Sequence, residues 1–150
     1  MRALIEALPL DTLLLVHALA TWWMAGVIWM VQLVHYPLMA LVSEARWRDY
    51  EDQHRRRITF VVMPAMLLEL ATSCWIAAHQ LAGDGPAWSG LVGLALVLAL
   101  WLSTFLVQTP LHMRLSQRFD AADHTRLVRS NWLRTLLWSA RAVLALLLLN

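Results

Sequence analysis

Titratable side chains interrupt a sequence that is otherwise apolar enough to lie in a membrane. Glu69, Arg134 and Arg141 stand inside long hydrophobic stretches, and so do most of the six histidines. A charged side chain at membrane depth costs between about 2.5 and more than 10 kcal/mol, so such residues usually face a protein interior or a wet cavity. We therefore treat these residues as the candidates for function.

These residue types allow two kinds of chemistry. Imidazole and carboxylate groups ligate iron or zinc, and histidine also exchanges protons near neutral pH. A guanidinium repels a bare cation but clamps a carboxylate or a phosphate with paired hydrogen bonds. The mixture therefore suits haem b with its propionates, a transition metal, or an anionic, partly apolar ligand such as a quinone-like aromatic molecule or a lipid headgroup. The candidate catalytic residues are His35, His112 and Glu69, the candidate ligand-binding residues are Gln108, Asn131, Arg134 and Arg141, and the candidate metal ligands are His17, His35 and His112.

Four apolar stretches must position these residues. The chain is 60% hydrophobic and 15% charged, against about a quarter charged in ordinary soluble domains. Each stretch exceeds the roughly 18 to 20 residues that a membrane-spanning helix needs. We therefore predict an all-α fold, an integral membrane four-helix bundle that forms a single domain over residues 1–150. The helices are expected at about 12–42, 57–82, 87–113 and 131–149, and the first is expected to be retained rather than cleaved as a secretory signal.

The distribution of arginine predicts how the bundle lies in the membrane. All 12 basic residues are arginine, and most of them fall between the first and second stretches or between the third and fourth. Basic residues are enriched in cytoplasmic loops, so both the N and C termini are expected on the non-cytoplasmic side of a multi-pass protein of the cell inner membrane. The expected partners are the lipid bilayer and either further copies of the chain, as a homo-oligomer, or a larger membrane complex. Nucleic acid is not an expected partner, because no basic face is free of the membrane surface.

Helical periodicity suggests which polar residues meet. His17 and His35 share one stripe but lie about 18 residues, roughly 27 Å, apart, so they cannot bind the same metal ion. Glu69 and Arg141 fall at similar depth, which predicts a buried ion pair between the second and fourth helices. The polar stripes converge on an expected pocket that opens to the cytoplasm, although the same side chains could instead serve only to hold the helices together. The expected lining of this pocket is His35, His54, Glu69, Gln108, His112, Asn131, Arg134 and Arg141.

The first helix carries a resemblance to known families. Its polar residue His17 is followed by Trp22, Trp23, Met24, Ala25 and Gly26. This run resembles the first helix of small four-helix membrane families that include the membrane-embedded protoporphyrinogen oxidase and copper-resistance type proteins. The resemblance implies that His17 is a haem or metal ligand.

Three further segments are similar to bacterial membrane proteins of unknown function. They are VQLVHYP at residues 31–37, TPLHMRL at residues 109–115 and NWLRTLLWSAR at residues 131–141. The chain also resembles the anthrone-oxygenase-type family, which has a late Arg-Thr pair where this sequence has Arg134 and Thr135. Together these likenesses cover most of the chain.

Two classes of function are consistent with these observations. The first is a membrane-embedded oxidoreductase, or a redox partner, that holds a haem, a metal or a quinone-like aromatic ligand in a polar pocket near the cytoplasmic face. In it, His17, His35 or His112 would act as ligand or proton carrier, and Arg134 and Arg141 would clamp an anion. The alternative is non-enzymatic, a small transporter or an accessory subunit of a larger membrane complex. Whether the chain is an enzyme therefore stays open.

The absorption spectrum of protein purified in mild detergent, with parallel metal analysis, separates these alternatives. A haem protein is expected to show a Soret band that shifts on reduction. A bound metal without a Soret band would direct attention to the inner histidines and Glu69. Colourless, metal-free protein would favour substrate binding, transport or an accessory role.

Overall fold

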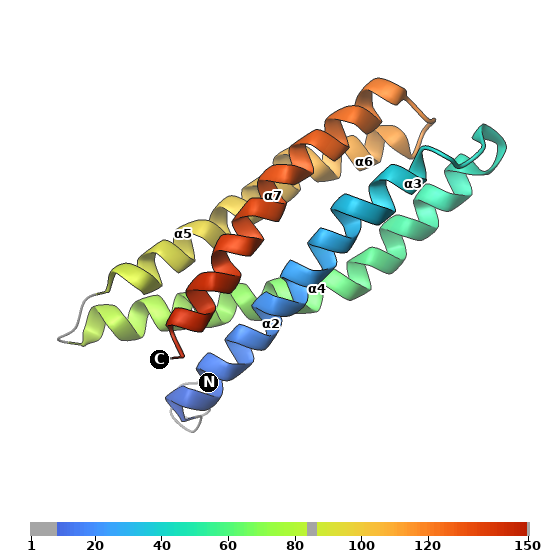
Figure 1. Ribbon diagram of the computed structural model, residues 1–150. Coiled ribbons are helices and arrows are strands. Elements are labelled where there is room, and N and C mark those ends of the chain that lie inside the picture. The colour runs from blue at the N-terminus through green and yellow to red at the C-terminus, as the bar shows by residue number, and fades with distance from the viewer. Residues whose placement is uncertain (1–8, 84–86, 150) are drawn as a thin grey trace.

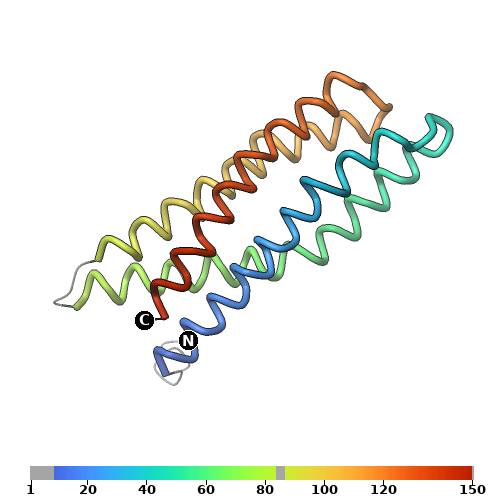
Figure 2. Tube along the Cα trace, viewed as in Figure 1, coloured from blue at the N-terminus to red at the C-terminus, as the bar shows by residue number. Residues whose placement is uncertain are grey.

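The computed structural model describes residues 9–83 and 87–149, and in these ranges the chain is all-helical and contains no strand. Four long helical segments run antiparallel and form a bundle (Figures 1 and 2), as the sequence predicted. The first segment comprises α2 (Leu10–Met30), the π-helical turn η1 (Val31–His35) and α3 (Tyr36–Met39). The second is α4 (Glu44–Ala82), and the fourth is α7 (Ala121–Leu147). The third comprises α5 (Trp88–Ser103), the π-helical turn η2 (Thr104–Gln108) and α6 (Thr109–Leu115).

The second and fourth helices begin earlier than the apolar stretches do. The expected starts lay near residues 57 and 131, but α4 begins at Glu44 and α7 at Ala121. These extra turns are charged on their outer side and bury single residues such as Trp47 and Leu127 against the bundle. The connections therefore shrink to residues 40–43 and 116–120. We call the end of the bundle that carries them the arginine-rich end, and the opposite end, where α4 ends and α5 begins, the turn end.

A capping residue starts α7. The Asp120 carboxylate accepts a hydrogen bond from the backbone N–H of Asp123 at 2.8 Å. This bond favours the ionised carboxylate and lowers the pKa of Asp120 below its ordinary value. The cap fixes where α7 turns back into the bundle.

Each π-helical turn lies just before a proline. The turn η1 ends two residues before Pro37, and η2 ends two residues before Pro110. A proline inside a helix lacks an N–H donor and crowds the carbonyl four residues earlier, and a π-helical turn accommodates this by inserting one extra residue. The first helical segment continues through Pro37 to Met39. The wide turns bury two glutamines, Gln32 and Gln108, inside the bundle.

The second helix bends about midway along its length (Figure 1), and Pro64 is the proline inside it. Near the turn end α4 packs along α5, whereas toward the arginine-rich end it makes only sparse contact with α6. The two helices therefore diverge, and the cavity described below lies between them.

The apolar side chains divide between a core and an outer surface. One core cluster lies midway along the bundle and a second near the arginine-rich end. The first contains Met24, Ala25, Ile28, Met66, Leu100, Trp138 and Ala142, and the second contains Val31, Tyr36, Met39, Trp47, Leu111, Leu115 and Leu127. Large apolar side chains also cover the outside of the bundle.

Within the described residues, three helical segments are long and apolar enough to cross a membrane, namely Leu10–Met39, Glu44–Ala82 and Trp88–Leu115. The fourth, α7, is not among them, since the buried Arg134 and Arg141 lower the mean hydropathy of its apolar half.

A close helix crossing gives a test of this packing. A Cβ atom on Gly90 would lie 2.9 Å from the Ala77 Cα atom and 2.7 Å from the Gln80 Oε1 atom, whereas a Cβ atom on Gly26 would meet nothing within 4 Å. We expect Gly90→Ala to destabilise the protein by about 1 to 3 kcal/mol through overpacking. Gly26→Ala should be neutral or stabilising by about 0.5 to 1 kcal/mol, because alanine is the better helix former. Thermal unfolding in detergent measures both, and equal midpoints for the two variants would contradict the crossing.

Candidate functional site

The expected polar residues form two clusters instead of one pocket. Glu69 and Arg141 lie together in the half of the bundle nearer the turn end, and they are joined there by His17. The histidines His35 and His112 lie near the arginine-rich end with His54. On α7 the two ligand-binding candidates Arg134 and Arg141 are seven residues apart, which is roughly 10 Å along the axis. They therefore belong to different sites.

The cluster nearer the turn end is closed around Arg141. This guanidinium pairs with the Glu69 carboxylate, donates to the Gly93 carbonyl, and donates to the Ser73 hydroxyl at 2.9 Å. Arg141 is 1% exposed and Glu69 is fully buried. The predicted ion pair between the second and fourth helices is thus confirmed, and its main effect is to neutralise two charges inside the bundle.

His17 is already engaged in this cluster. The Thr72 hydroxyl donates its proton to the Leu68 carbonyl at 2.8 Å, so the His17 Nδ1 atom must donate to the Thr72 oxygen at 2.7 Å. The His17 Nε2 atom then carries the lone pair and accepts from Arg141 at 3.4 Å. Both ring nitrogens have partners, and the ring lies apart from His35 and His112. This geometry gives no support to His17 as a metal ligand.

A hydrogen-bonded chain of three side chains lies near the arginine-rich end. The His112 Nδ1 atom is 2.6 Å from the Glu51 Oε1 atom, and the His112 Nε2 atom is 3.2 Å from the Tyr36 hydroxyl. Glu51 is fully buried and Tyr36 is 3% exposed. A carboxylate on one ring nitrogen orients an imidazole and fixes its tautomer, which prepares the other nitrogen to exchange a proton. The chain can therefore carry a proton between Tyr36 and Glu51.

Two more histidines adjoin this chain. The rings of His35 and His54 are stacked with centroids 4.3 Å apart, and the His54 and His112 centroids are 5.4 Å apart. The His35 Nε2 atom and the Glu51 Oε2 atom are buried without a hydrogen-bond partner. We call His35, Glu51, His54 and His112 the histidine cluster. As the side chains stand, no three His, Cys, Asp or Glu residues in ranges 9–83 and 87–149 are arranged to hold a metal ion.

Glu51 and Tyr36 were not among the residues selected from the sequence. Glu51 lies in a run of charged residues, and such a run predicts an exposed connection between helices. The available signal was the Glu51-x-x-His54 spacing, which places both side chains on one helix face, together with Trp47 one turn earlier. Tyr36 could have been found from its place beside His35, directly before Pro37.

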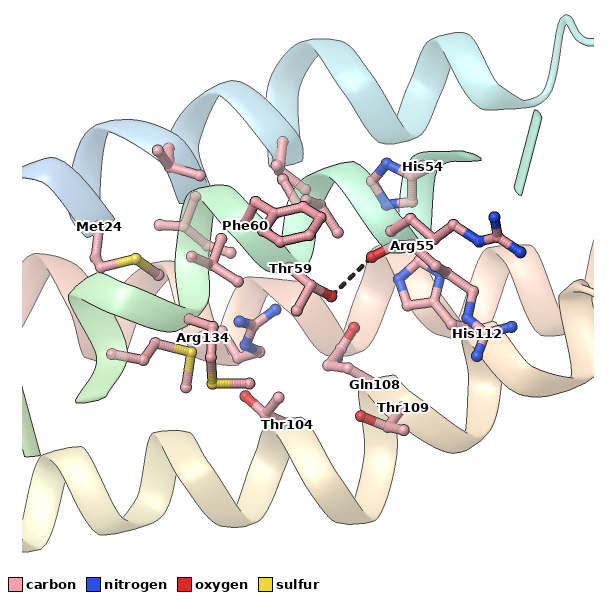
Figure 3. Close-up of a pocket in the computed structure, with 18 of the residues that line it drawn as sticks. Met24, His54, Arg55, Thr59, Phe60, Thr104, Gln108, Thr109, His112 and Arg134 are labelled. Carbon is pink, nitrogen blue, oxygen red and sulfur yellow. Dashed lines mark hydrogen bonds between the residues drawn. The ribbon is translucent and has the colours of Figure 1, made fainter. Parts of the chain in front are cut away.

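A cavity of about 640 Å³ lies beside the histidine cluster (Figure 3). Its walls come from α4 on one side and from η2 and α6 on the other, with parts of α2, η1, α3 and α7. One region of the lining is apolar and includes Met24, Ile28, Val62, Met63 and Met66, and another is polar and includes His54, Arg55, Gln108, His112 and Arg134. The lining residues Phe60 and Phe105 are 81% and 53% exposed on the outside of the bundle. The cavity therefore opens sideways between α4 and η2.

Arg134 is a buried charged group in the lining of this cavity. Figure 3 shows its guanidinium between Met24 and Gln108. The side chain is 7% exposed, its Nη1 atom donates to the Asn131 Oδ1 atom at 3.1 Å, and its Nε atom has no partner. No carboxylate of the described residues pairs with it, in contrast to Arg141. A guanidinium buried without a counter-charge is costly, so this position favours an anionic or strongly hydrogen-bond-accepting ligand.

The neighbours of Arg134 hold it in place and add an acceptor. Asn131 donates to the Gln32 Oε1 atom at 2.9 Å, and Gln32 donates to the Val128 carbonyl. Asn131 thus lies behind Arg134 and does not line the cavity. Gln108 does line it; its amide donates to Ser130 at 3.0 Å and its Oε1 atom is unpartnered. That oxygen could accept a hydrogen bond from a hydroxyl group in the cavity.

A second cavity of about 400 Å³ reaches the histidine cluster from its other side. It is lined by His35, Tyr50, His54 and Arg57, among others. Of the eight residues expected in one pocket, four line the large cavity, namely His54, Gln108, His112 and Arg134. His35 faces the second cavity, and Glu69, Asn131 and Arg141 face neither.

The buried ion pair can be tested by a double-mutant cycle. We expect Glu69→Ala to cost about 3 to 5 kcal/mol, because it leaves Arg141 buried and uncompensated. The double variant Glu69→Ala with Arg141→Ala should be more stable than the single variant. Denaturant unfolding in detergent measures the stabilities of Glu69→Ala, Arg141→Ala and the double variant. Asp52→Ala serves as the control, since the Asp52–Arg55 pair is solvent-exposed and worth at most about 1 kcal/mol. Strictly additive losses at Glu69 and Arg141 would show that the pair is not coupled.

Comparison of the chain with known proteins gave no match to a family model, to a curated protein or to a solved structure.

Proposed function

We propose that this protein is a membrane-embedded oxidoreductase, or the redox partner of one, that binds a quinone-like amphipathic ligand in the large cavity. In this proposal all four helical segments cross the inner membrane with both termini outside the cytoplasm, as the arginine distribution favours. The cavity would then lie in the cytoplasmic half of the bilayer. The proposal chiefly depends on the Arg134 guanidinium, which is buried without a carboxylate partner and has a free Nε donor.

The polar part of the cavity suits the head of such a ligand. Arg134 has an Nε donor without a partner, and Gln108 has an acceptor oxygen without a partner. A quinone carbonyl or a phenolate would accept from Arg134, and a quinol hydroxyl would donate to Gln108. The ligand would thereby supply hydrogen-bond partners for the Arg134 Nε atom and the Gln108 Oε1 atom.

The apolar part of the cavity suits the rest of the ligand. Met24, Met63 and Met66 form a soft, polarisable surface on which an aromatic ring can pack. Phe60 and Phe105 are exposed where the cavity meets the outside of the bundle. In a bilayer this opening would face acyl chains, so an apolar tail could extend between α4 and η2 without contacting water.

The chain from Tyr36 through His112 to Glu51 suits proton exchange with this ligand. Reduction of a quinone to a quinol takes up two electrons and two protons, and oxidation releases them. Tyr36 and His112 both line the cavity, so they can pass a proton between the ligand and Glu51. The electrons would have to come from, or go to, a partner protein or a second redox group. A role as a redox partner follows from that requirement.

The hydrogen bonding of His17 and His112 favours a quinone-like ligand over haem bound to either residue. Both ring nitrogens of His17 and both ring nitrogens of His112 have partners within the protein. Haem ligation through either residue would break these bonds, whereas a quinone uses donors and acceptors that are free.

The shape of the Arg134 side chain should matter as much as its charge. We expect Arg134→Lys to weaken binding of a short-chain ubiquinone analogue by roughly 10- to 100-fold, because the planar guanidinium is lost and a charge-assisted hydrogen bond is worth about 1.5 to 3 kcal/mol. Quenching of tryptophan fluorescence in lipid nanodiscs measures the affinity.

The matched control is Arg129→Lys, an exposed position on the same helix, which should bind as tightly as the unaltered protein. Equal affinity of Arg134→Lys and the unaltered protein would remove Arg134 from the site. Failure of the unaltered protein to bind the analogue would contradict the proposed function and favour a transporter or an accessory subunit.

A further inference from the structure

We infer that the second cavity is a binding site for the headgroup of an anionic phospholipid, with Arg57 as the residue that contacts the phosphate. The inference requires that the chain lies in a bilayer, which its apolar outer surface supports. It does not require that the large cavity binds a quinone-like ligand.

The second cavity is a groove between the first and second helical segments. His35 contributes from the end of η1, and the other lining residues come from about three turns of α4. The volume of about 400 Å³ lies within the roughly 300 to 1,000 Å³ of ordinary small-ligand sites. The Trp23 indole donates to the Val61 carbonyl at 3.3 Å and so joins α2 to α4 beside the groove. The lining residues are His35, Tyr50, Gln53, His54, Arg57, Ile58 and Val61.

The groove lies where α4 changes from a polar to an apolar helix. Residues 44–57 are rich in charge, whereas residues 58–68 contain no Asp, Glu, Lys or Arg. In a bilayer such a boundary falls between the headgroups and the acyl chains. A bound phospholipid would therefore place its phosphate beside Arg57 and the start of its acyl chains against Ile58 and Val61. A free phosphate ion would leave these two apolar side chains without a contact.

The charge of the groove selects an anionic headgroup. Within the described part of the chain, no Asp or Glu lines the second cavity. Arg57 donates to the Gln53 Oε1 atom at 3.2 Å and pairs with no carboxylate of the described residues. The two carboxylates directly before Gln53 are engaged elsewhere, by Arg55 and by His112. The guanidinium of Arg57 is therefore free to bind a phosphate group, which it can do with paired hydrogen bonds.

Further hydrogen-bonding groups accompany Arg57. Tyr50 lies two turns before it and Gln53 one turn before it, so the three side chains share one face of α4. The stacked rings of His35 and His54 lie beside them. Phenol, amide and imidazole groups can all donate hydrogen bonds to phosphate oxygens. Basic pockets between helices on the cytoplasmic side of membrane proteins bind lipid headgroups, and this groove has that composition and that position.

Native mass spectrometry of the full chain in a neutral detergent tests this inference, because it counts bound lipids. We expect one dioctanoyl phosphatidylglycerol per chain to bind at least about 5-fold more tightly than dioctanoyl phosphatidylcholine. Arg57→Gln should weaken phosphatidylglycerol binding by about 5-fold or more, as expected for one basic residue near an anionic headgroup. Gln53→Glu should weaken it by at least as much, because the new carboxylate would pair with Arg57 one turn later and repel the phosphate.

The matched controls are Arg118→Gln and Gln117→Glu, which make the same charge changes at exposed positions of the arginine-rich end outside the groove. Both should bind phosphatidylglycerol as the unaltered protein does. Thermal unfolding verifies that each variant is folded, and Gln53→Glu provides the test if Arg57→Gln is not.

Three results would overturn the site. They are equal affinity of the unaltered protein for the two lipids, equal affinity for phosphatidylglycerol in the groove variants and their controls, and displacement of phosphatidylglycerol by inorganic phosphate, since a free anion would then suffice. Phosphatidylglycerol binding without binding of the quinone analogue overturns only the proposed function. The reverse outcome overturns only the lipid site.

Discussion

A buried positive charge needs a counter-charge, and this requirement separates the two arginines inside α7. Arg141 meets it within the protein, through Glu69 and the polar groups around that pair. Arg134 is held by an amide oxygen, and the Asp52 carboxylate that also lines the cavity pairs with Arg55 instead. The first arginine therefore contributes to the architecture of the bundle, because it joins α4 to α5 and α7. Arg134 has a donor without a partner inside the cavity, and this donor is the reason for proposing an anionic or hydrogen-bond-accepting ligand.

Three prolines shape the space around this site. Pro37 and Pro110 each follow a π-helical turn, and those turns direct Gln32 and Gln108 into the bundle. Pro64 lies inside α4, which bends about midway along its length (Figure 1), and toward the arginine-rich end α4 makes only sparse contact with α6. The cavity, its opening between α4 and η2 and the neighbouring histidine cluster all lie in the region so created. Irregular helices at a functional site are common, since they reposition side chains that a regular helix would place elsewhere.

The sequence was sufficient for the helical fold and for the Glu69–Arg141 pair. Long charge-free stretches predict helices, and residues at equal depth on adjacent helices can be paired by counting. Counting residues along the helices failed to predict which side chains meet where the helices depart from the regular α-helical period. The π-helical turns insert extra residues before His35 and before His112, and the bend in α4 separates the environment of Glu69 from that of His54. Glu51 was missed for another reason, because charged neighbours hide a buried carboxylate and only its spacing to His54 and Trp47 distinguishes it.

Photoaffinity labelling with an azido-quinone in lipid nanodiscs tests the central claim most directly, since it reports where a ligand sits. After proteolysis and mass spectrometry, the account predicts labelled peptides from α4 and from η2 that contain Phe60 and Phe105, the two exposed rings beside the opening. An excess of unmodified quinone should suppress this labelling. Labelling that is spread evenly over the outer surface, or concentrated near the turn end and insensitive to competition, would contradict a binding site at Arg134.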